Sequence, residues 1–154
     1  MGLLGETKPV KKPILGVSLY PEQESMEEIE NYLTMASRYG FTKIFTSMFS
    51  VPGTKEEVFD YFKNFCDLAH KHGMKVSGDC NTAFFKKMGA SESDISIFKE
   101  MGIDIIRMDL PYFDQRDVTL INNPYNITIE LSSCMIQAVR MALENLSLIH
   151  IWRC

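Results

Sequence analysis

The sequence predicts an α/β protein with a parallel sheet, because one unit recurs along the chain. In each unit an apolar run ends in polar residues, an amphipathic helix follows, and a glycine precedes the next apolar run. Gly40, Gly73 and Gly102 are these glycines, and their spacing of about 30 residues matches one strand, one helix and two short loops. Successive units of this kind form right-handed crossovers between parallel strands. The chemistry of such folds lies at the C-terminal ends of the strands.

The first two units are the most regular. We expect a strand at residues 14–20, followed by a capping box in Ser25-Met-Glu-Glu28, in which the serine accepts from the glutamate amide and the glutamate reaches back. An amphipathic helix follows this box. The second strand is expected at residues 43–49, and Thr54-Lys-Glu-Glu57 forms a second capping box before a helix that runs to residue 73.

The later units are shorter, and their elements are less regular. In chain order we expect a strand at 75–79, a helical turn at 83–88, a helix capped by Ser93 and ended by Gly102, a strand at 103–109, a short helix or turn at 114–123, a strand at 127–131 and a helix at 135–144.

Five strands leave two architectures open. A closed (β/α)8 barrel needs at least about 200 residues, so the chain is either the first part of such a barrel or an open five-stranded sheet. Neither a G-x-G-x-x-G motif nor a P-loop lysine follows the first strand, which disfavours a nucleotide-binding sheet.

The composition argues against several classes of function. The chain has 154 residues, enough for one domain, and a net charge of -4, so we expect no nucleic-acid partner. No apolar stretch reaches the roughly 18–20 residues that cross a bilayer, and no secretory signal is evident, so we expect a cytoplasmic protein without a membrane partner. The cysteines form no C-x-x-C pair and the histidines do not converge. We therefore expect reduced thiols, no metal and no cofactor.

The domain that the pattern predicts covers residues 13–145. Residues 1–12 are polar, and we expect a flexible lead-in there. Residues 146–154 hold the only tryptophan, have no link to the preceding pattern, and resemble translated adapter sequence at the end of a short assembled reading frame. The alternative for this tail is a genuine short strand at residues 146–152.

Polar side chains gather toward the C-terminal end of each expected strand. Strand side chains alternate, so residues two positions apart share a face. A buried parallel strand is normally a continuous apolar run, and charges there are costly unless they are paired or used. The polar sets are Ser18 with Tyr20, Thr46 or Ser47 according to the register, Ser77 with Asp79 and Asn81, Arg107 with Asp109, and Thr128 with Glu130 and Ser132.

These sets predict a polar pocket with three carboxylates, Asp79, Asp109 and Glu130, and one internal cation, Arg107. Carboxylates held together with too little counter-charge have pKa values that split, one raised and one low. A general acid beside a nucleophile or base needs that arrangement, as in glycosidases. The three carboxylates are the catalytic candidates. The substrate-binding candidates are Ser18, Tyr20, Thr46, Ser47, Asn81 and Arg107.

Structural roles are the alternatives for the same residues. Arg107 could form an ion pair within the sheet with Asp109 or Glu130. Asp79 could cap the next helix, and Tyr20 could be a core aromatic with a satisfied hydroxyl. A metal-binding carboxylate cluster is a further alternative, but too few neutral ligands converge on it. The recurrence of polar residues at equivalent places in successive units favours a functional site.

Five segments, in this order and spacing, resemble the N-terminal barrel of the MupG family: Leu15–Pro21, Gly40–Ser47, the strand-end Asp79, Arg107-Met-Asp109 and Asn123–Leu131. The resemblance covers about residues 13–144. It implies the N-terminal part of a TIM (β/α)8 barrel, about five βα units, without the small cyclophilin-like C-terminal domain of the family. It also implies that Asp79, Asp109 and Glu130 occupy the acidic positions at the ends of strands three, four and five.

The family consists of bacterial 6-phospho-N-acetylmuramidases, also described as outer surface proteins. The resemblance implies a cytoplasmic glycoside hydrolase of peptidoglycan recycling. Its substrate would be a small phosphorylated amino-sugar disaccharide, 6-phospho-N-acetylmuramyl-N-acetylglucosamine. The chain departs from the family pattern after Asp109, with Leu-Pro-Tyr in place of Tyr-Gly-Phe, and after Leu131, with Ser-Ser-Cys in place of Asn-Ala-Ser. Because the later strands are missing, we expect the 154-residue chain itself to be inactive.

Two other functions stay open at this point. A sugar-phosphate isomerase or aldolase on the same barrel would need a strand-end lysine for a Schiff base, or a metal set of histidines and carboxylates. No expected strand end offers a lysine. A small non-catalytic α/β binding module would use Arg107 as an anion anchor, and fold-level analogy alone does not separate these functions.

Overall fold

A computed structural model of the chain describes residues 13–91, 93–109, 123–133 and 150–153, and in these ranges six strands form one parallel sheet. The strands are β1 (Gly16–Ser18), β2 (Lys43–Ser47), β3 (Lys75–Cys80), β4 (Ile105–Asp109), β5 (Thr128–Ser133) and β6 (His150–Arg153). The helices in these ranges are α1 (Met26–Arg38), α2 (Lys55–Lys71), α3 (Thr82–Lys87) and α4 (Ser96–Met101), with the 3-10 turns η1 (Pro21–Gln23) and η2 (Met48–Ser50).

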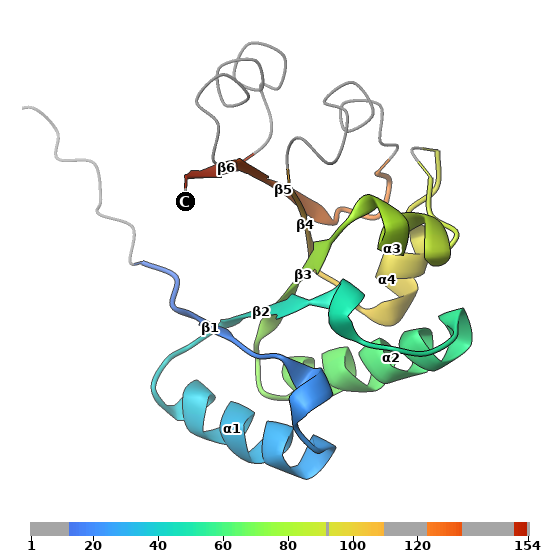
Figure 1. Cartoon of the computed structure of the whole chain (residues 1–154). Helices are drawn as coiled ribbons and strands as arrows, with labels where there is room; N and C mark the ends of the chain where they lie inside the picture. Colours follow the sequence, from blue (N-terminus) through green and yellow to red (C-terminus); the bar gives the residue numbers. More distant parts are fainter. Residues whose placement is uncertain (1–12, 92, 110–122, 134–149, 154) are drawn as a thin grey trace, which may run out of the picture.

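The spatial order of the strands is the order of the chain, β1-β2-β3-β4-β5-β6. A doubly wound sheet reverses direction at a switch point, whereas this sheet never does. Right-handed crossovers that always advance in one direction put every connecting helix on the same face. Figure 1 shows α1, α2 and α4 on one side of the curved sheet. The predicted α/β fold of the barrel type is confirmed, and the chain-ordered winding differs from the strand order of a doubly wound open sheet.

Both predicted capping boxes are present. In the first, the Glu28 amide donates to Ser25 Oγ at 3.3 Å and the Ser25 amide donates to Glu28 Oε2 at 2.9 Å. In the second, the Glu57 amide donates to Thr54 Oγ1 at 3.2 Å and the Thr54 amide donates to Glu57 Oε2 at 2.7 Å. These bonds satisfy amides that the first turn of a helix leaves without partners.

Several predicted boundaries differ from the structure, with β1, β4 and β5 among them, and two of the differences have a clear local cause. The helix expected to be capped by Ser93 begins at Ser96 instead, and the Ser96 amide donates to Asp94 Oδ1 at 2.8 Å. A carboxylate two residues ahead of the helix takes the role that was expected of the serine. The second strand ends at Ser47 rather than at residue 49, because η2 turns the chain and Ser50 Oγ donates to the Ser47 carbonyl at 2.9 Å. Gly102 ends α4 with a φ of 88°, as predicted.

Several expectations fall outside the described residues or stay untested. The lead-in at 1–12, most of the element at 114–123 and the helix at 135–144 are outside them. In the expected tail, β6 pairs with β5 in parallel, which overlaps the short strand considered as the alternative. The assignment of the tail and of the domain limits remains a prediction.

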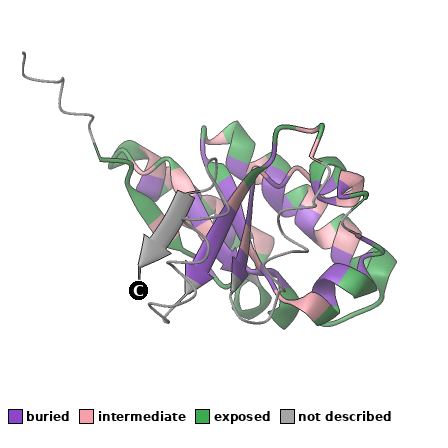
Figure 2. Ribbon diagram, turned by 90° about the horizontal axis from the view of Figure 1, so that it is seen from above, coloured by how far each residue is buried: buried purple, intermediate pink, exposed green. Residues whose placement is uncertain are grey.

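The hydrophobic core lies between the sheet and the helices. Figure 2 shows buried residues along the strands and on the helix sides that face them. Phe62 and Phe65 on α2 pack edge to face, with ring centroids 6.3 Å apart. Gly78 on β3 makes room for this layer, because a Cβ atom there would collide with the Sδ atom of the fully buried Met48.

We expect Gly78→Ala to lower the free energy of unfolding by about 1–3 kcal/mol, because the added methyl group overpacks the core against Met48. Urea denaturation followed by circular dichroism measures the change. Gly16→Ala is the matched control, since its added Cβ atom meets nothing closer than 3.4 Å. Equal effects of the two substitutions would show that Met48 yields without cost.

Candidate active site

The concave face of the sheet carries one row of predicted site residues. The register pairs Ser47 with Asp79, Asp79 with Arg107, and Arg107 with Glu130. These four residues therefore follow one another across β2, β3, β4 and β5, on the face opposite to the helices. The predicted pocket joined Asp79, Arg107 and Glu130, and the register shows that they are neighbours in one row with Ser47.

Asp109, the third carboxylate, ends β4 and pairs in register with Ser132 on β5. Its backbone continues the alternation of Ile105 and Arg107, which places it on the same face, one step closer to the C-terminal ends. The side chain of Asp109 lies outside the described residues, so its chemical role stays a prediction.

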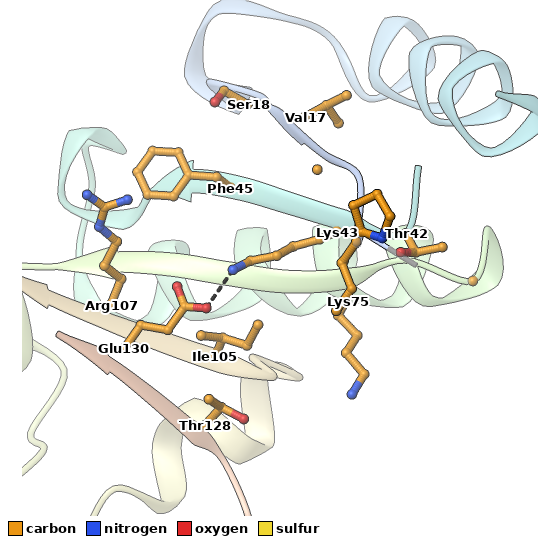
Figure 3. A pocket seen from close by; sticks show the side chains of 14 residues that line it. Val17, Ser18, Thr42, Lys43, Phe45, Lys75, Ile105, Arg107, Thr128 and Glu130 are labelled. Atoms are coloured by element: carbon orange, nitrogen blue, oxygen red, sulfur yellow. Dashed lines mark hydrogen bonds and ion pairs between the residues drawn. The ribbon is translucent and has the colours of Figure 1, made fainter. Parts of the chain in front are cut away.

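Glu130 is held by a lysine from a distant strand. Its side chain is 10% exposed, and its Oε1 atom lies 2.6 Å from Lys43 Nζ, a contact visible in Figure 3. Ser77 Oγ lies 3.5 Å from the other carboxylate oxygen. Lys43 belongs to β2, so the ion pair passes over β3 and β4 on the concave side.

The prediction of Arg107 as the one internal cation is wrong, because Lys43 also lies on this face and is 20% exposed. Lys43 is the first residue of β2, and the sequence predicted it only as the start of that strand. The signal that could have identified it is its period-two spacing from Phe45 and Ser47, which places a lysine on the same face as the polar row.

Arg107 lies beside an aromatic ring. Its guanidinium carbon is 5.1 Å from the centroid of the Phe45 ring, within the range of a cation–π contact. Its Nη2 atom donates to Ser132 Oγ at 2.9 Å. Glu130, which is directly opposite Arg107 in the sheet, is the partner of Lys43.

Three other candidates lie around this row. Ser18 lines a large hollow on the concave face, together with Lys43 and Arg107. Tyr20 follows β1 and is 45% exposed, so the alternative of a core aromatic is wrong. It borders a second, smaller hollow next to α1. Asn81 caps α3, since its Oδ1 atom accepts from the Phe84 amide at 2.8 Å.

The main hollow differs from the expected pocket. It has a volume of about 1260 Å³ and is lined by residues from the beginning and middle of the strands, including Thr42, Lys75 and Thr128. In a closed barrel this region is a packed core, and catalytic groups lie at the C-terminal ends of the strands. We therefore assign the candidate site to the strand ends that carry Asp79 and Asp109, and the hollow to the barrel interior.

Cys80 directly follows Asp79, yet it is no candidate nucleophile. It is 1% exposed, and burial raises the pKa of its thiol, with the Asp79 charge adding to the effect. Burial also raises the pKa of the Cys66 thiol. A thiol held neutral in this way is unreactive.

We expect Cys66 and Cys80 to resist iodoacetamide in the folded protein at pH 8, because both thiols are buried and neutral at that pH. Mass spectrometry of the two peptides measures the modified fraction. The same protein in concentrated urea is the control, and both cysteines react there. Modification of Cys80 at equal rates in both conditions would contradict its burial.

Thr46 and Ser47 were alternatives for one site position, and the structure separates them. Ser47 is in the row with Asp79, whereas Thr46 faces the helices and is fully buried. Within the described residues, Thr46 Oγ1 makes no hydrogen bond. A buried hydroxyl without a partner costs stability.

We expect Thr46→Val to raise the free energy of unfolding by about 1 kcal/mol, because it removes this hydroxyl and keeps the branched shape. The midpoint of urea unfolding, at an unchanged slope, measures the gain. Ser47→Ala on the other face is the control, and it gives no such gain. A loss of stability in Thr46→Val would show that the hydroxyl is satisfied.

Among the described residues, no three histidines, cysteines, aspartates or glutamates are close enough to hold a metal ion. None of the helices in the described ranges is both long and apolar enough to cross a membrane.

A parallel sheet wound in chain order, with candidate carboxylates toward the C-terminal ends of its strands, is the arrangement of a TIM-type α/β protein. The chain belongs to the family of 6-phospho-N-acetylmuramidase N-terminal domains, whose model matches residues 15–149. The match ends just before β6. No curated protein matches the chain.

Solved structures agree with the fold. An uncharacterised B. cereus protein is 33% identical with a TM-score of 0.65, and the match covers 88% of this chain and 34% of that one. A conserved protein of unknown function from Enterococcus faecalis is 20% identical with a TM-score of 0.68, covering 92% and 39%. The Thermobaculum terrenum O-GlcNAc hydrolase is 12% identical with a TM-score of 0.59, covering 91% and 40%. The chain thus spans between a third and two fifths of the length of these three proteins.

Proposed function

We propose that this chain is the N-terminal part of a cytoplasmic glycoside hydrolase of peptidoglycan recycling. Its substrate is the disaccharide of 6-phospho-N-acetylmuramic acid and N-acetylglucosamine. The observation that carries the proposal is the family match over residues 15–149, together with carboxylates at the ends of neighbouring strands. The solved structures that the chain matches are longer, and the chain covers 34%, 39% and 40% of them, so the proposal concerns the complete enzyme.

The site supports acid–base cleavage of a glycosidic bond. One carboxyl group protonates the leaving oxygen, and a second acts as nucleophile or activates a water molecule. Asp79 and Glu130 are in the same row of the sheet, with Glu130 in contact with Lys43, and Asp109 is one step closer to the C-terminal ends. Arg107 adds a positive charge beside them, which suits a substrate that carries a phosphate and a carboxylate.

The aldolase alternative gains no support from Lys43. A Schiff-base lysine must reach a substrate at the strand ends and be neutral when it attacks. Lys43 is the first residue of β2, and its ammonium group pairs with Glu130 at 2.6 Å. Lys43 therefore forms an ion pair on the inner face of the sheet and lies away from the strand ends.

We expect Asp79→Asn, Asp109→Asn and Glu130→Gln each to lower kcat for the phosphorylated disaccharide, and the variant that removes the general acid or the nucleophile to lower it by at least about 100-fold. The assay uses the complete gene product, whose frame is read from the source DNA through the 3′ end. Released N-acetylglucosamine measures turnover.

Asp67→Asn on the exposed surface of α2 is the matched control, because it removes a carboxylate whose ion pair, in the part of the chain that the structure describes, is with Lys63 on the same helix. Its kcat stays at the wild-type value. Wild-type rates in all three strand-end variants, or no turnover of the disaccharide by the complete wild-type protein, would overturn the proposed function.

A further inference from the structure

Arg107 and Glu130 are directly opposite each other in the sheet, and yet the structure gives each of them a different partner. Glu130 Oε1 accepts from Lys43 Nζ at 2.6 Å, and Arg107 Nη2 donates to Ser132 Oγ at 2.9 Å. Pairs between arginine and a carboxylate are among the strongest hydrogen-bonded contacts in proteins. A glutamate whose charge no other cation offsets favours pairing with an arginine directly opposite it. Here the Lys43 ammonium contacts Glu130 Oε1 and offsets that charge, which weakens the attraction between Glu130 and Arg107.

The guanidinium of Arg107 is instead held toward the strand ends. Ser132 is two residues beyond Glu130 on β5, so the bond to Ser132 draws Arg107 toward the C-terminal end. The Phe45 ring supports the guanidinium from β2, and Figure 3 shows it beside that ring, apart from the Lys43–Glu130 contact. Ligands of parallel α/β folds bind at this end of the sheet.

We infer that Lys43 is a positioning residue: by pairing with Glu130, it keeps Arg107 turned toward the strand ends, where Arg107 binds the anionic group of the sugar ligand. The planar fork of a guanidinium matches both a phosphate and a carboxylate, so either anionic group of the ligand suits it. The inference rests on the proposed function for the kind of ligand, but it needs no turnover.

Calorimetric titration of the complete protein tests this inference with four sugars. N-acetylglucosamine 6-phosphate carries only a phosphate, N-acetylmuramic acid carries only a carboxylate, N-acetylmuramic acid 6-phosphate carries both, and N-acetylglucosamine carries neither. Lys43→Met releases the Glu130 carboxylate to Arg107, so we expect the affinity for at least one anionic sugar to fall about tenfold or more. The affinity for the neutral sugar stays constant.

The decisive variant is the double substitution Lys43→Met with Glu130→Gln. Without a carboxylate, Arg107 returns to Ser132, and anion affinity recovers to within about threefold of the Glu130→Gln single variant. Lys43→Arg also preserves binding, since it keeps the ion pair. Lys75→Met is the matched control, because Lys75 lines the same hollow next to Lys43 and the substitution removes the same charge. It leaves the affinity unchanged.

The set of sugars identifies the group that Arg107 binds. A loss of affinity for only the phosphorylated sugars assigns Arg107 to the phosphate. A loss of affinity for only the muramic acids assigns it to the carboxylate. An unchanged affinity in Lys43→Met, an equal loss for the neutral sugar, or no recovery in the double variant overturns the inference. If Lys43→Met does not fold, Lys43→Gln, which donates a neutral hydrogen bond, takes its place with the same criteria. Failure of hydrolysis in the wild type bears on the proposed function alone.

Discussion

The structure depends on a sheet that always winds in one direction. Each strand from β2 to β6 pairs with the strand before it, so every right-handed crossover places its helix on the same face. The face of the sheet that meets the helices forms the apolar core, which includes Ile44, Val76 and Ile106. The opposite face of the sheet is concave. Side chains on that concave face can meet across several strands. A polar residue there can pair with a residue on a distant strand, as Lys43 does with Glu130.

The pair of Lys43 and Glu130 shows what this curvature allows. The two residues are 87 positions apart and on strands separated by two others, and their charged atoms are 2.6 Å apart. Removing one partner of a buried ion pair typically costs about 3–5 kcal/mol, because the remaining charge has lost its compensation. The pair therefore constrains both the chemistry and the curvature of the sheet. It holds Glu130 in an ion pair inside the barrel, whereas Arg107, the neighbour of Glu130 in the sheet, donates to Ser132.

Local features of this structure could be predicted from the sequence, and features that depend on curvature could not. The capping boxes at Ser25 and Thr54 join residues only three positions apart, so the short sequence motif contains every group that takes part in them. The choice between Thr46 and Ser47 depends on register, and a shift of one residue reverses the face. The contact between Lys43 and Glu130 requires the relative position of two distant strands, which no spacing along the chain reveals.

The chain-ordered sheet also has a consequence for how the protein is made. Each strand that leaves the ribosome finds the edge of the preceding strand already in place, so pairing can advance with synthesis, one unit at a time. Contacts between successive units are short in sequence, which favours rapid folding. The contact between Lys43 and Glu130 can form only once β5 has emerged. It is therefore the point at which early and late parts of the nascent chain first become locked together.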